Sequence, residues 1–279
     1  MIRSKYNLFF DYEGKKIAFN AMTCGLAQVD NDFFEVYNKA EDFSSDDNSN
    51  ELIKDMKRGG FILDEGSDEM NVLKFRCNRG RFNESFYSLT IAPTIQCNFA
   101  CPYCYETAKP GIMSKDVQDK LVELVEENAK LKKKIDVTWY GGEPLLAKKI
   151  VYSLSERFME ICARYEAEYS AGIITNGYLF EEEDIEKFNK YKIRFTQITI
   201  DGTREVHNTR RILKADPSAD TFDKIINTVR LLNKSNSRVV IRVNVDKTNI
   251  QNTIELINYL ASEEAGIDKT RTSVAFGHV

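Results

Sequence analysis

The sequence predicts an α/β fold: an open, parallel barrel of six strand–helix alternations, preceded by a small α+β domain. Two observations lead to this prediction. From Tyr87 onward, short apolar strand patterns alternate with helical patterns, which is typical of a parallel sheet. Before Tyr87, the order is a strand pair, helices and one short strand, which indicates a separate unit. A chain of 279 residues, 42% of them hydrophobic, is long enough to bury a core in both.

Residues 1–88 are predicted to form a winged-helix-like domain. Apolar and aromatic runs at 6–12 and 16–20 flank a Glu13-Gly14 turn and predict a hairpin. The elements expected after the hairpin are a helix that Asp32 can cap, a helix over 50–58, a strand over 61–63 and a helix over 68–78.

Residues 89–279 are predicted to form a partial (β/α)6 TIM-like barrel. Ser114 can cap its first helix, on which Val117, Leu121 and Val125 share one face. Strands are expected over 88–91, 135–139, 172–174, 196–200, 239–245 and 272–276. About 190 residues fall short of a closed eight-stranded barrel, so an open one is expected.

Three cysteines lie close together in the loop after the first predicted barrel strand. Cys97, Cys101 and Cys104 have the spacing Cys-x3-Cys-x2-Cys. Thiolates this close can meet one inorganic centre, and a cubane of four irons takes four ligands. No fourth cysteine is near, so the spacing predicts a [4Fe–4S] cluster with one open iron. The alternative is a zinc site lacking its fourth ligand, but His207 and His278 are both distant in sequence.

With Phe99 and Tyr103 between them, these cysteines resemble the signature of radical S-adenosylmethionine (SAM) enzymes. The resemblance implies that SAM binds the open iron through its amino and carboxylate groups, with Tyr103 at the cofactor. It also implies a 5′-deoxyadenosyl radical, an electron donor such as flavodoxin or ferredoxin, and a cytoplasmic location. The cofactor supplies the radical chemistry, and the protein orients it.

Polar and glycine-bearing motifs follow the next two predicted strands, where a parallel barrel binds its ligands. Gly141-Gly142-Glu143-Pro144 follows the second strand, and its glycines let backbone carbonyls face an ammonium group. The resemblance implies that this motif receives the SAM amino group; the alternative is a tight turn before a helix. Asn176, after the third strand, could bond a ribose hydroxyl or belong only to a turn.

The fourth strand leads into a segment that resembles the Ser-x-Asp-Gly-x4-His-Asp-x2-Arg pattern of sulfatase and peptide maturases. The resemblance implies that Thr199 contacts the SAM ribose or carboxylate and that Arg211 pairs with the carboxylate. Thr199 stands for Ser and keeps the hydroxyl, whereas Asn208 stands for Asp, which puts an acid role there in doubt. Arg210 replaces Arg211 if the register slips by one. His207 is either a proton carrier or a hydrogen-bonded structural histidine.

The resemblance as a whole implies a radical SAM enzyme of the SPASM-type branch that modifies a ribosomally synthesised peptide, for example by thioether crosslinking. Residues 1–88 would then bind the leader of that peptide, or else only cover one end of the barrel. No cysteine follows Cys162, so the chain is expected to lack the auxiliary-cluster domain of that branch. The alternatives are an anaerobic sulfatase-maturase-like protein oxidase and a truncated, non-catalytic cluster- or leader-binding module.

Composition narrows the possible partners and compartments. The net charge of −4 and the lack of a dense basic stripe argue against a nucleic-acid partner. No apolar run reaches roughly 18 residues, so no membrane span is predicted, and the N-terminus lacks an apolar secretion signal. Six cysteines, three of them at metal spacing, suit a reducing cytoplasm better than a disulfide framework.

Overall fold

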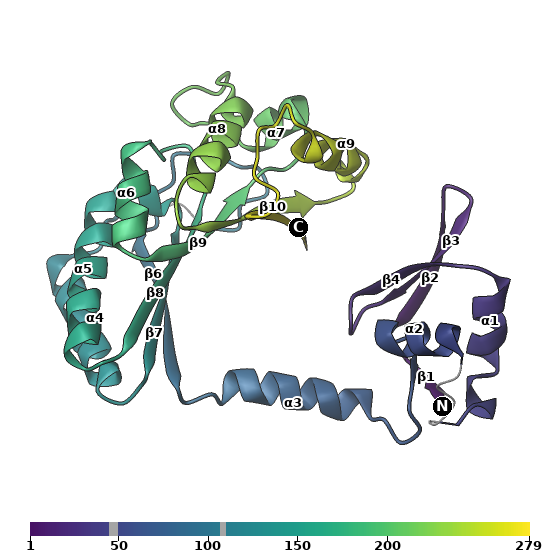
Figure 1. Cartoon of the computed structure of the whole chain (residues 1–279). Coiled ribbons are helices and arrows are strands. Elements are labelled where there is room, and N and C mark those ends of the chain that lie inside the picture. The colour runs from purple at the N-terminus through teal and green to yellow at the C-terminus, as the bar shows by residue number, and fades with distance from the viewer. Residues whose placement is uncertain (45–49, 107–109) are drawn as a thin grey trace. The chain divides into compact units, whose positions relative to one another are not determined.

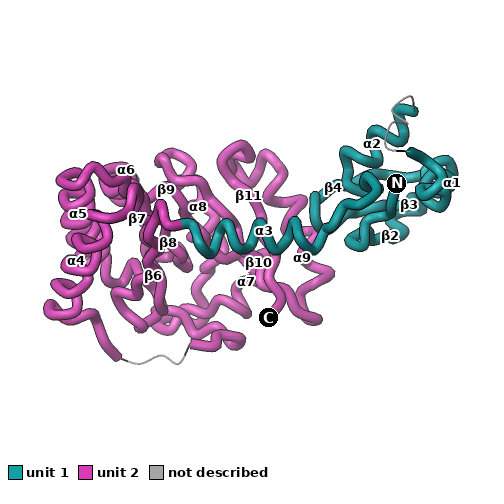
Figure 2. Tube along the Cα trace, turned by 90° about the horizontal axis from the view of Figure 1, so that it is seen from below, with its two compact units in different colours: residues 1–83 teal, residues 84–279 magenta. Residues whose placement is uncertain are grey.

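The computed structural model describes residues 1–44, 50–106 and 110–279, and the chain divides into two compact units (Figures 1 and 2). Unit 1 is Met1–Asn83 and unit 2 is Glu84–Val279. Each unit has a hydrophobic core of its own. Among the described residues, no helix is both long enough and apolar enough to cross a bilayer.

Unit 1 contains a three-stranded antiparallel sheet, in which β3 lies between β2 and β4. The strands are β2 (Asn7–Tyr12), β3 (Lys15–Asn20) and β4 (Gly25–Val29). Glu13 and Gly14 both have positive φ (49° and 73°), as a tight two-residue hairpin requires. The predicted hairpin is therefore confirmed, and β4 extends it. A second, two-stranded sheet pairs β1 (Ile2–Arg3) with β5 (Ile62–Leu63).

The helices of unit 1 are α1 (Asn31–Asn38), the 3-10 turn η1 (Ala40–Asp42), α2 (Glu51–Gly59) and α3 (Glu69–Arg81). The predicted cap of α1 is wrong, because Asp32 lies inside the first turn. Asp30 has the extended backbone that a cap needs, and its carboxylate accepts from the Phe33 N–H at 3.0 Å. Asn50 caps α2, which ends at Gly60 with φ 77°.

Unit 2 is built on a six-stranded sheet, and all its neighbouring strands are parallel. Its strands follow the chain in order: β6 (Phe86–Thr94), β7 (Lys134–Gly141), β8 (Glu168–Thr175), β9 (Ile193–Thr199), β10 (Arg238–Val245) and β11 (Thr272–His278). The sheet curves, and the helices lie along its outer face (Figure 1). The predicted partial barrel is confirmed, and its strand ends meet at one edge.

The helices of unit 2 are α4 (Lys115–Ala129), the 3-10 turn η2 (Pro144–Ala147), α5 (Lys148–Arg164), α6 (Glu183–Lys190), α7 (Arg204–Arg210), α8 (Thr221–Asn233) and α9 (Ile250–Ala261). Ser114 caps α4 as predicted. Val117 does not share the buried face: it is 49% exposed, because α4 buries its second half, at Val125 and Ala129. The sequence did not predict α7, which follows β9.

Candidate functional site

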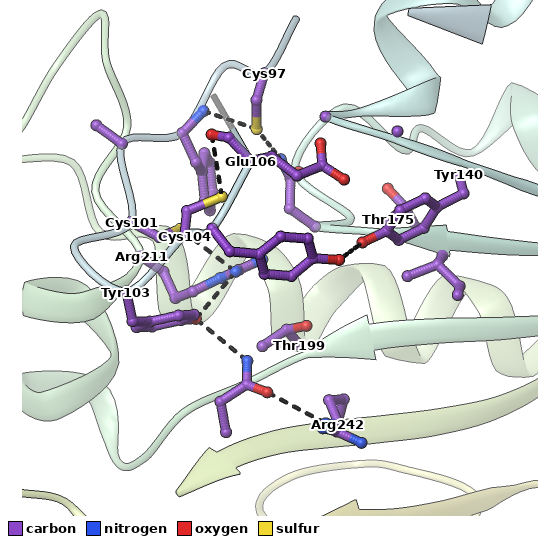
Figure 3. A pocket seen from close by; sticks show the side chains of 18 of the residues that line it. Cys97, Cys101, Tyr103, Cys104, Glu106, Tyr140, Thr175, Thr199, Arg211 and Arg242 are labelled. Atoms are coloured by element: carbon purple, nitrogen blue, oxygen red, sulfur yellow. Dashed lines mark hydrogen bonds between the residues drawn. The ribbon is translucent and has the colours of Figure 1, made fainter. Parts of the chain in front are cut away.

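A cavity of about 830 Å³ opens at the C-terminal ends of the unit 2 strands (Figure 3). Its wall consists of the loop after β6, the ends of β7 to β11 and the segment after α7. The predicted site residues that line it are Cys97, Cys101, Tyr103, Cys104, Gly141, Gly142, Asn176, Thr199 and Arg211. Glu143 and Pro144 are buried and do not line it.

The cysteine loop is attached to the segment after α7 by hydrogen bonds. The Ala100 N–H donates to the Ile212 carbonyl, and the Lys214 N–H donates to the Asn98 carbonyl, both at 2.8 Å. The Lys214 ammonium donates to the Cys97 carbonyl at 2.9 Å. These hydrogen bonds to the segment after α7 therefore position residues 97–100 of the cysteine loop.

The three thiols differ in exposure but share one electrostatic environment. Cys97 and Cys101 are half-buried, and Cys104 is exposed. Burial raises the pKa of Cys97 and of Cys101. At Cys101 the Arg211 charge lowers the pKa, whereas Cys97 and Cys104 raise it. The sulfurs are thus close enough to influence one another.

The two glycines of the predicted SAM motif let the end of β7 pack against the chain leading into the cysteines. Gly141 has φ 113°, and a Cβ there would lie 2.2 Å from the Thr94 carbonyl oxygen. A Cβ on Gly142 would lie 2.4 Å from the Gln96 carbonyl oxygen. Backbone cannot yield to such overlaps cheaply, so both positions require glycine.

Glu143 joins the ends of β7 and β8 from within the protein. Its side chain is fully buried. One carboxylate oxygen accepts from the Leu145 N–H at 2.9 Å and from the Thr175 hydroxyl at 2.7 Å; the other accepts from the Asn176 N–H at 2.7 Å. Burial raises the pKa of Glu143, and these three bonds lower it. The carboxylate is therefore occupied by protein donors.

Asn176 faces the cysteine loop. Its amide nitrogen donates to the Asn98 side-chain oxygen at 2.7 Å and lies 3.9 Å from the Cys97 sulfur. Its amide oxygen accepts from the Tyr178 N–H at 2.9 Å. The structure thus gives Asn176 a supporting contact to the cysteine loop, and its contact with a ribose remains a prediction.

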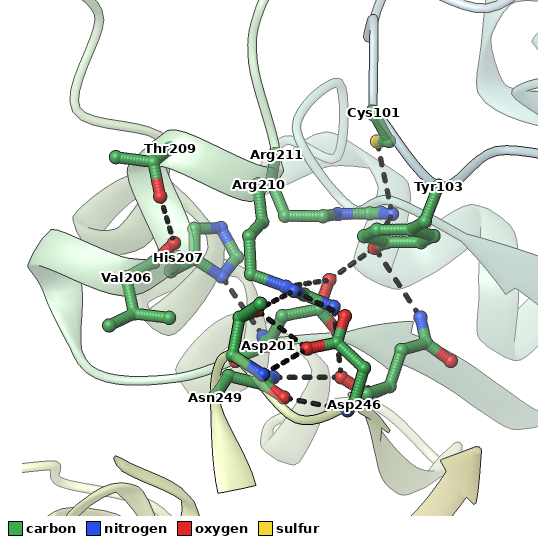
Figure 4. A network of polar contacts seen from close by, with 12 residues as sticks. Cys101, Tyr103, Asp201, Val206, His207, Thr209, Arg210, Arg211, Asp246 and Asn249 are labelled. Atoms are coloured by element: carbon green, nitrogen blue, oxygen red, sulfur yellow. Dashed lines mark hydrogen bonds and ion pairs between the residues drawn. The ribbon is translucent and has the colours of Figure 1, made fainter. Parts of the chain in front are cut away.

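A buried polar network surrounds Asp201, just after the end of β9 (Figure 4). Asp201 is fully buried, and one of its oxygens accepts from the Tyr103 hydroxyl. The other accepts from the Asn244 N–H at 2.9 Å, and the Asn249 side chain donates to the Asp201 carbonyl at 2.7 Å. Burial raises the pKa of Tyr103, so the phenol keeps its proton. Tyr103 is therefore anchored through its hydroxyl to the end of β9.

Arg211 lines the cavity next to Tyr103. It is only 9% exposed, and it donates to the Tyr103 hydroxyl at 3.2 Å and to the Cys101 sulfur at 3.4 Å. Its guanidinium lies over the Phe99 ring, 5.3 Å from the centroid. Burial lowers the pKa of Arg211, but Tyr103, Cys101 and Asp201 raise it by more, so the charge is retained.

Arg210 is turned away from the cavity, into the network around Asp201 (Figure 4). It donates to the Asp246 carboxylate at 2.8 Å, and its Nε lies 4.0 Å from an Asp201 oxygen. Its guanidinium lies 5.0 Å from the Tyr103 ring centroid. Of the two neighbouring arginines, it is Arg211 that lines the cavity.

His207 is fully buried and does not line the cavity. Its Nδ1 accepts from the Asp201 N–H at 3.4 Å, and its ring packs edge-on against Phe222. Burial, with a contribution from Arg211, lowers the pKa of His207 to about 3. This geometry favours the structural histidine over the proton carrier.

The residues around the cavity fit the two predicted cofactors. Three thiols line it, and in a cubane each thiolate binds a different iron. Their sulfurs need not meet at one point, and in the described part of the chain no three His, Cys, Asp or Glu side chains could hold a single metal ion. Beside them, the buried Nε of Arg211 has no partner among the described residues, so this cation can still donate to an anion.

Sequence reasoning missed three residues that position this site. Asp201 occupies the Asp position of the motif after the fourth strand, but no role was predicted for it. Asn244 and Lys214 carry no sequence signal, because a single polar residue on a strand or loop reads as exposed. Only their partners, the Tyr103 hydroxyl and the Cys97 carbonyl, show what they do.

The chain is similar to several curated proteins. Radical SAM cyclopropyl synthase TigE of Paramaledivibacter caminithermalis is 23% identical over 253 residues, which cover 75% of this chain and 53% of TigE. Sporulation killing factor maturation protein SkfB of Bacillus subtilis is 23% identical over 194 residues, which cover 68% of this chain and 43% of SkfB. The chain thus spans about half the length of these relatives.

A solved structure shares the fold. Native anSMEcpe with bound AdoMet and Cp18Cys peptide aligns with a TM-score of 0.55 at 23% identity, over 68% of this chain and 50% of that chain. The sequence profile described as the Radical SAM superfamily matches residues 91–260, which include the three cysteines and Arg211. Members of this family bind a [4Fe–4S] cluster and SAM, the two cofactors predicted from the cysteine triplet. The chain belongs to the radical SAM superfamily.

Proposed function

We propose that this chain is a radical SAM enzyme that modifies a ribosomally synthesised peptide. The observation that carries the proposal is that three thiols and the Arg211 guanidinium line one cavity at the strand ends. When bound, the reduced cluster and SAM supply a 5′-deoxyadenosyl radical that removes a hydrogen atom from the substrate. The residues of the chain hold and orient these groups.

Each side of the cavity has its part in binding the cofactors. Cys97, Cys101 and Cys104 would hold the cluster as its three protein ligands. The β7 end at Gly141 and Gly142 presents backbone to the SAM amino group. Across the cavity, Arg211 pairs with the SAM carboxylate, because a guanidinium and a carboxylate form a favourable bidentate pair.

Two further cavity residues, Tyr103 and Thr199, contact SAM in this proposal. Tyr103, anchored to Asp201 by its hydroxyl, offers its ring as part of the wall beside the cofactor. The Thr199 hydroxyl contacts the ribose or the carboxylate. Glu143 and Pro144 act indirectly, because they fix the turn after the two glycines from the buried side.

A peptide substrate is supported by the relatives and by unit 1. SkfB is a maturation protein, and the anSMEcpe structure contains a peptide. In unit 1, the apolar side chains of Leu8, Phe10, Tyr12 and Leu26 are 48–68% exposed on one face of the β2-β3-β4 sheet. An extended peptide can add to an edge strand such as β2 and place its side chains on such a face. We therefore assign leader binding to this winged-helix-like domain.

Two further assignments follow from the cofactors. A one-electron donor such as flavodoxin or ferredoxin would be the redox partner of this chain. A cytoplasmic location suits this cluster and the six cysteines, which are all free thiols in the structure.

Protein oxidation of the sulfatase-maturase type is the second candidate. Serine-type anaerobic sulfatase-maturating enzyme of Bacteroides thetaiotaomicron is 29% identical over 147 residues, 50% of this chain and 34% of that enzyme. Incubating the reduced holoenzyme with a sulfatase-derived peptide and with peptides encoded beside its gene separates the two, since mass spectrometry shows which one changes.

The cluster assignment is tested by anaerobic reconstitution. Wild-type chain should carry about four irons, with a broad absorbance at ~400 nm, and should release 5′-deoxyadenosine from SAM after reduction. The variant Cys97→Ala/Cys101→Ala/Cys104→Ala should lose all three properties. Cys77→Ala, which removes an exposed helix thiol, is the matched control and should keep them. SAM cleavage by the triple variant would contradict the assignment.

The leader assignment is tested on the full chain with a labelled leader from a precursor peptide encoded beside its gene. Leu8→Ser/Phe10→Ser should weaken binding by tenfold or more, because about 25 cal/mol of free energy is lost per Å² of apolar contact. Val72→Ser, on an exposed site of α3, is the control. Equal binding by all three proteins would remove unit 1 from leader recognition.

A further inference from the structure

Arg242 is a cationic residue of the cavity wall to which the proposed function assigns no cofactor contact. It projects from β10 into the cavity wall (Figure 3). Its Nε donates to the Asn244 side-chain oxygen at 3.2 Å. Among the described residues, it forms no ion pair with any carboxylate. A half-buried guanidinium without a counter-ion is suited to a ligand.

The other cavity cations already have partners at the cysteine loop. Arg211 donates to the Cys101 sulfur, and the Lys214 ammonium donates to the Cys97 carbonyl. Both lie where three thiolates would concentrate negative charge. Among the described residues of that loop, Arg242 has no hydrogen-bond partner, so its charge has another use.

The fold makes room for Arg242. A Cβ on Gly277 of β11 would lie 1.5 Å from the Arg242 Nη2 and 1.9 Å from its Cζ. The guanidinium therefore lies against the backbone of β11 at Gly277, and glycine is the residue that permits this. Gly277 needs no special backbone angle, so the requirement comes from Arg242.

The bond to Asn244 decides which edge of the guanidinium remains free. Asn244 occupies Nε, so the edge formed by the two Nη atoms is left for a ligand. Those atoms match the two oxygens of a carboxylate. We propose that Arg242 binds an acidic side chain, Asp or Glu, of the peptide substrate and so fixes which residue reaches the radical. This inference rests on the proposed function, because it names a feature of the same substrate.

A displayed library tests the inference without knowledge of the natural substrate. Random decapeptides between neutral Gly-Ser linkers are selected on reconstituted full chain with SAM, under anaerobic conditions. Peptides bound by the wild type should be enriched in Asp or Glu at one position by roughly tenfold to hundredfold, as expected for a charge-assisted pair. Arg242→Glu should reverse the preference to Lys or Arg. Arg238→Gln, an exposed arginine at the start of β10, should select as the wild type does.

SAM also carries a carboxylate, and a second measurement separates it from the peptide. Wild-type chain should bind SAM more tightly than decarboxylated SAM. Arg242→Gln should retain this discrimination, whereas Arg211→Ala should lose it. Loss of discrimination in Arg242→Gln would assign Arg242 to SAM and overturn the inference.

The outcomes of the library also separate the inference from the proposed function. Recovered peptides with no acidic preference would overturn the role of Arg242 and leave a peptide substrate standing. An acidic preference that persists in Arg242→Glu would do the same. Failure to recover any peptide above background would overturn both.

Discussion

Two fully buried carboxylates hold the two sides of the cavity, and they do so by different means. Glu143 connects the ends of β7 and β8 and accepts only neutral donors, two backbone N–H groups and the Thr175 hydroxyl. Asp201 connects the end of β9 to the cysteine loop and to β10, and Arg210 lies at 4.0 Å from it. One side is thus held by hydrogen bonds alone, and the other by hydrogen bonds within a charged network.

The difference matches what each side binds. The Glu143 side presents glycine backbone to a ligand ammonium group. Hydrogen bonds from neutral donors to Glu143 are sufficient to fix that backbone. The Asp201 side must keep Arg211 charged and correctly oriented while the Cys101 sulfur lies 3.4 Å away. Neighbouring groups of negative charge or potential raise the pKa of Arg211, so a network with net charge suits this side.

The largest effect on stability is expected from Asp201→Asn. The change removes the charge that faces Arg210 and places an amide N–H₂ against a donor, so the free energy of unfolding should fall by about 3–5 kcal/mol. Urea unfolding of the full chain, followed by circular dichroism, measures it. If Glu143→Gln lowers the free energy of unfolding more than Asp201→Asn does, then the charged network around Asp201 does not contribute more to stability than the hydrogen bonds of Glu143.

Arg211→Ala and Arg210→Ala should separate the contribution of the Asp201 side to SAM binding from its contribution to protein stability. We expect Arg211→Ala to weaken SAM binding by about 2–4 kcal/mol, roughly thirty- to thousand-fold, with iron content unchanged. Equilibrium dialysis of reconstituted protein against SAM measures this loss. Arg210→Ala should mainly lower stability, through the loss of its bond to Asp246. The reverse result would place Arg210 at the carboxylate.

Glu143→Gln should have a smaller effect than Asp201→Asn. Gln keeps one acceptor oxygen but turns an N–H₂ toward a buried donor, and one unsatisfied buried group costs about 1–3 kcal/mol. The same urea titration measures it. Glu143→Ala, which loses all three bonds, is the comparison and should cost more; an equal cost would mean that the bonds add little.

The smallest effect concerns pH and His207. The folded state lowers its pKa to about 3 from an ordinary value of 6.5, so the unfolded chain binds the proton first as pH falls. The stability contribution is therefore complete above pH 6.5 and is lost as pH falls below it. From pH 7 to pH 6, the wild type should lose about 0.7 kcal/mol more than His207→Asn, which cannot titrate. Identical pH profiles would mean that His207 is already accessible to protons.

The sequence predicted the barrel because its signal is local. Each strand is a short apolar run, and the residues after each run had to meet at one edge once the strands were parallel. The sequence alone therefore placed the cysteine triplet, Gly141 and Arg211 at one site. The cap of α1 was misplaced by two residues, since Asp30 and Asp32 are equivalent in pattern and only backbone angles distinguish them.

The supporting residues could not be predicted in this way. Asp201, Asn244 and Arg242 act through partners that are distant in the sequence, such as Tyr103 and Gly277. Nothing in a single polar residue on a strand says which neighbour it will meet. Likewise, the motif suggests that Glu143 faces a ligand. Only its burial and its three hydrogen-bond donors show that it connects the ends of β7 and β8 instead.

The unequal exposure of the three cysteines sets an order of attack by reagents dissolved in water. Cys104 is exposed, whereas Cys97 and Cys101 are half-buried, with pKa values raised by burial. Alkylation requires an accessible thiolate, and burial reduces both access and the thiolate fraction. Before iron is loaded, iodoacetamide should therefore label Cys104 faster than the other two. A brief exposure to the reagent would therefore modify Cys104 and leave the Cys97 and Cys101 thiols unmodified.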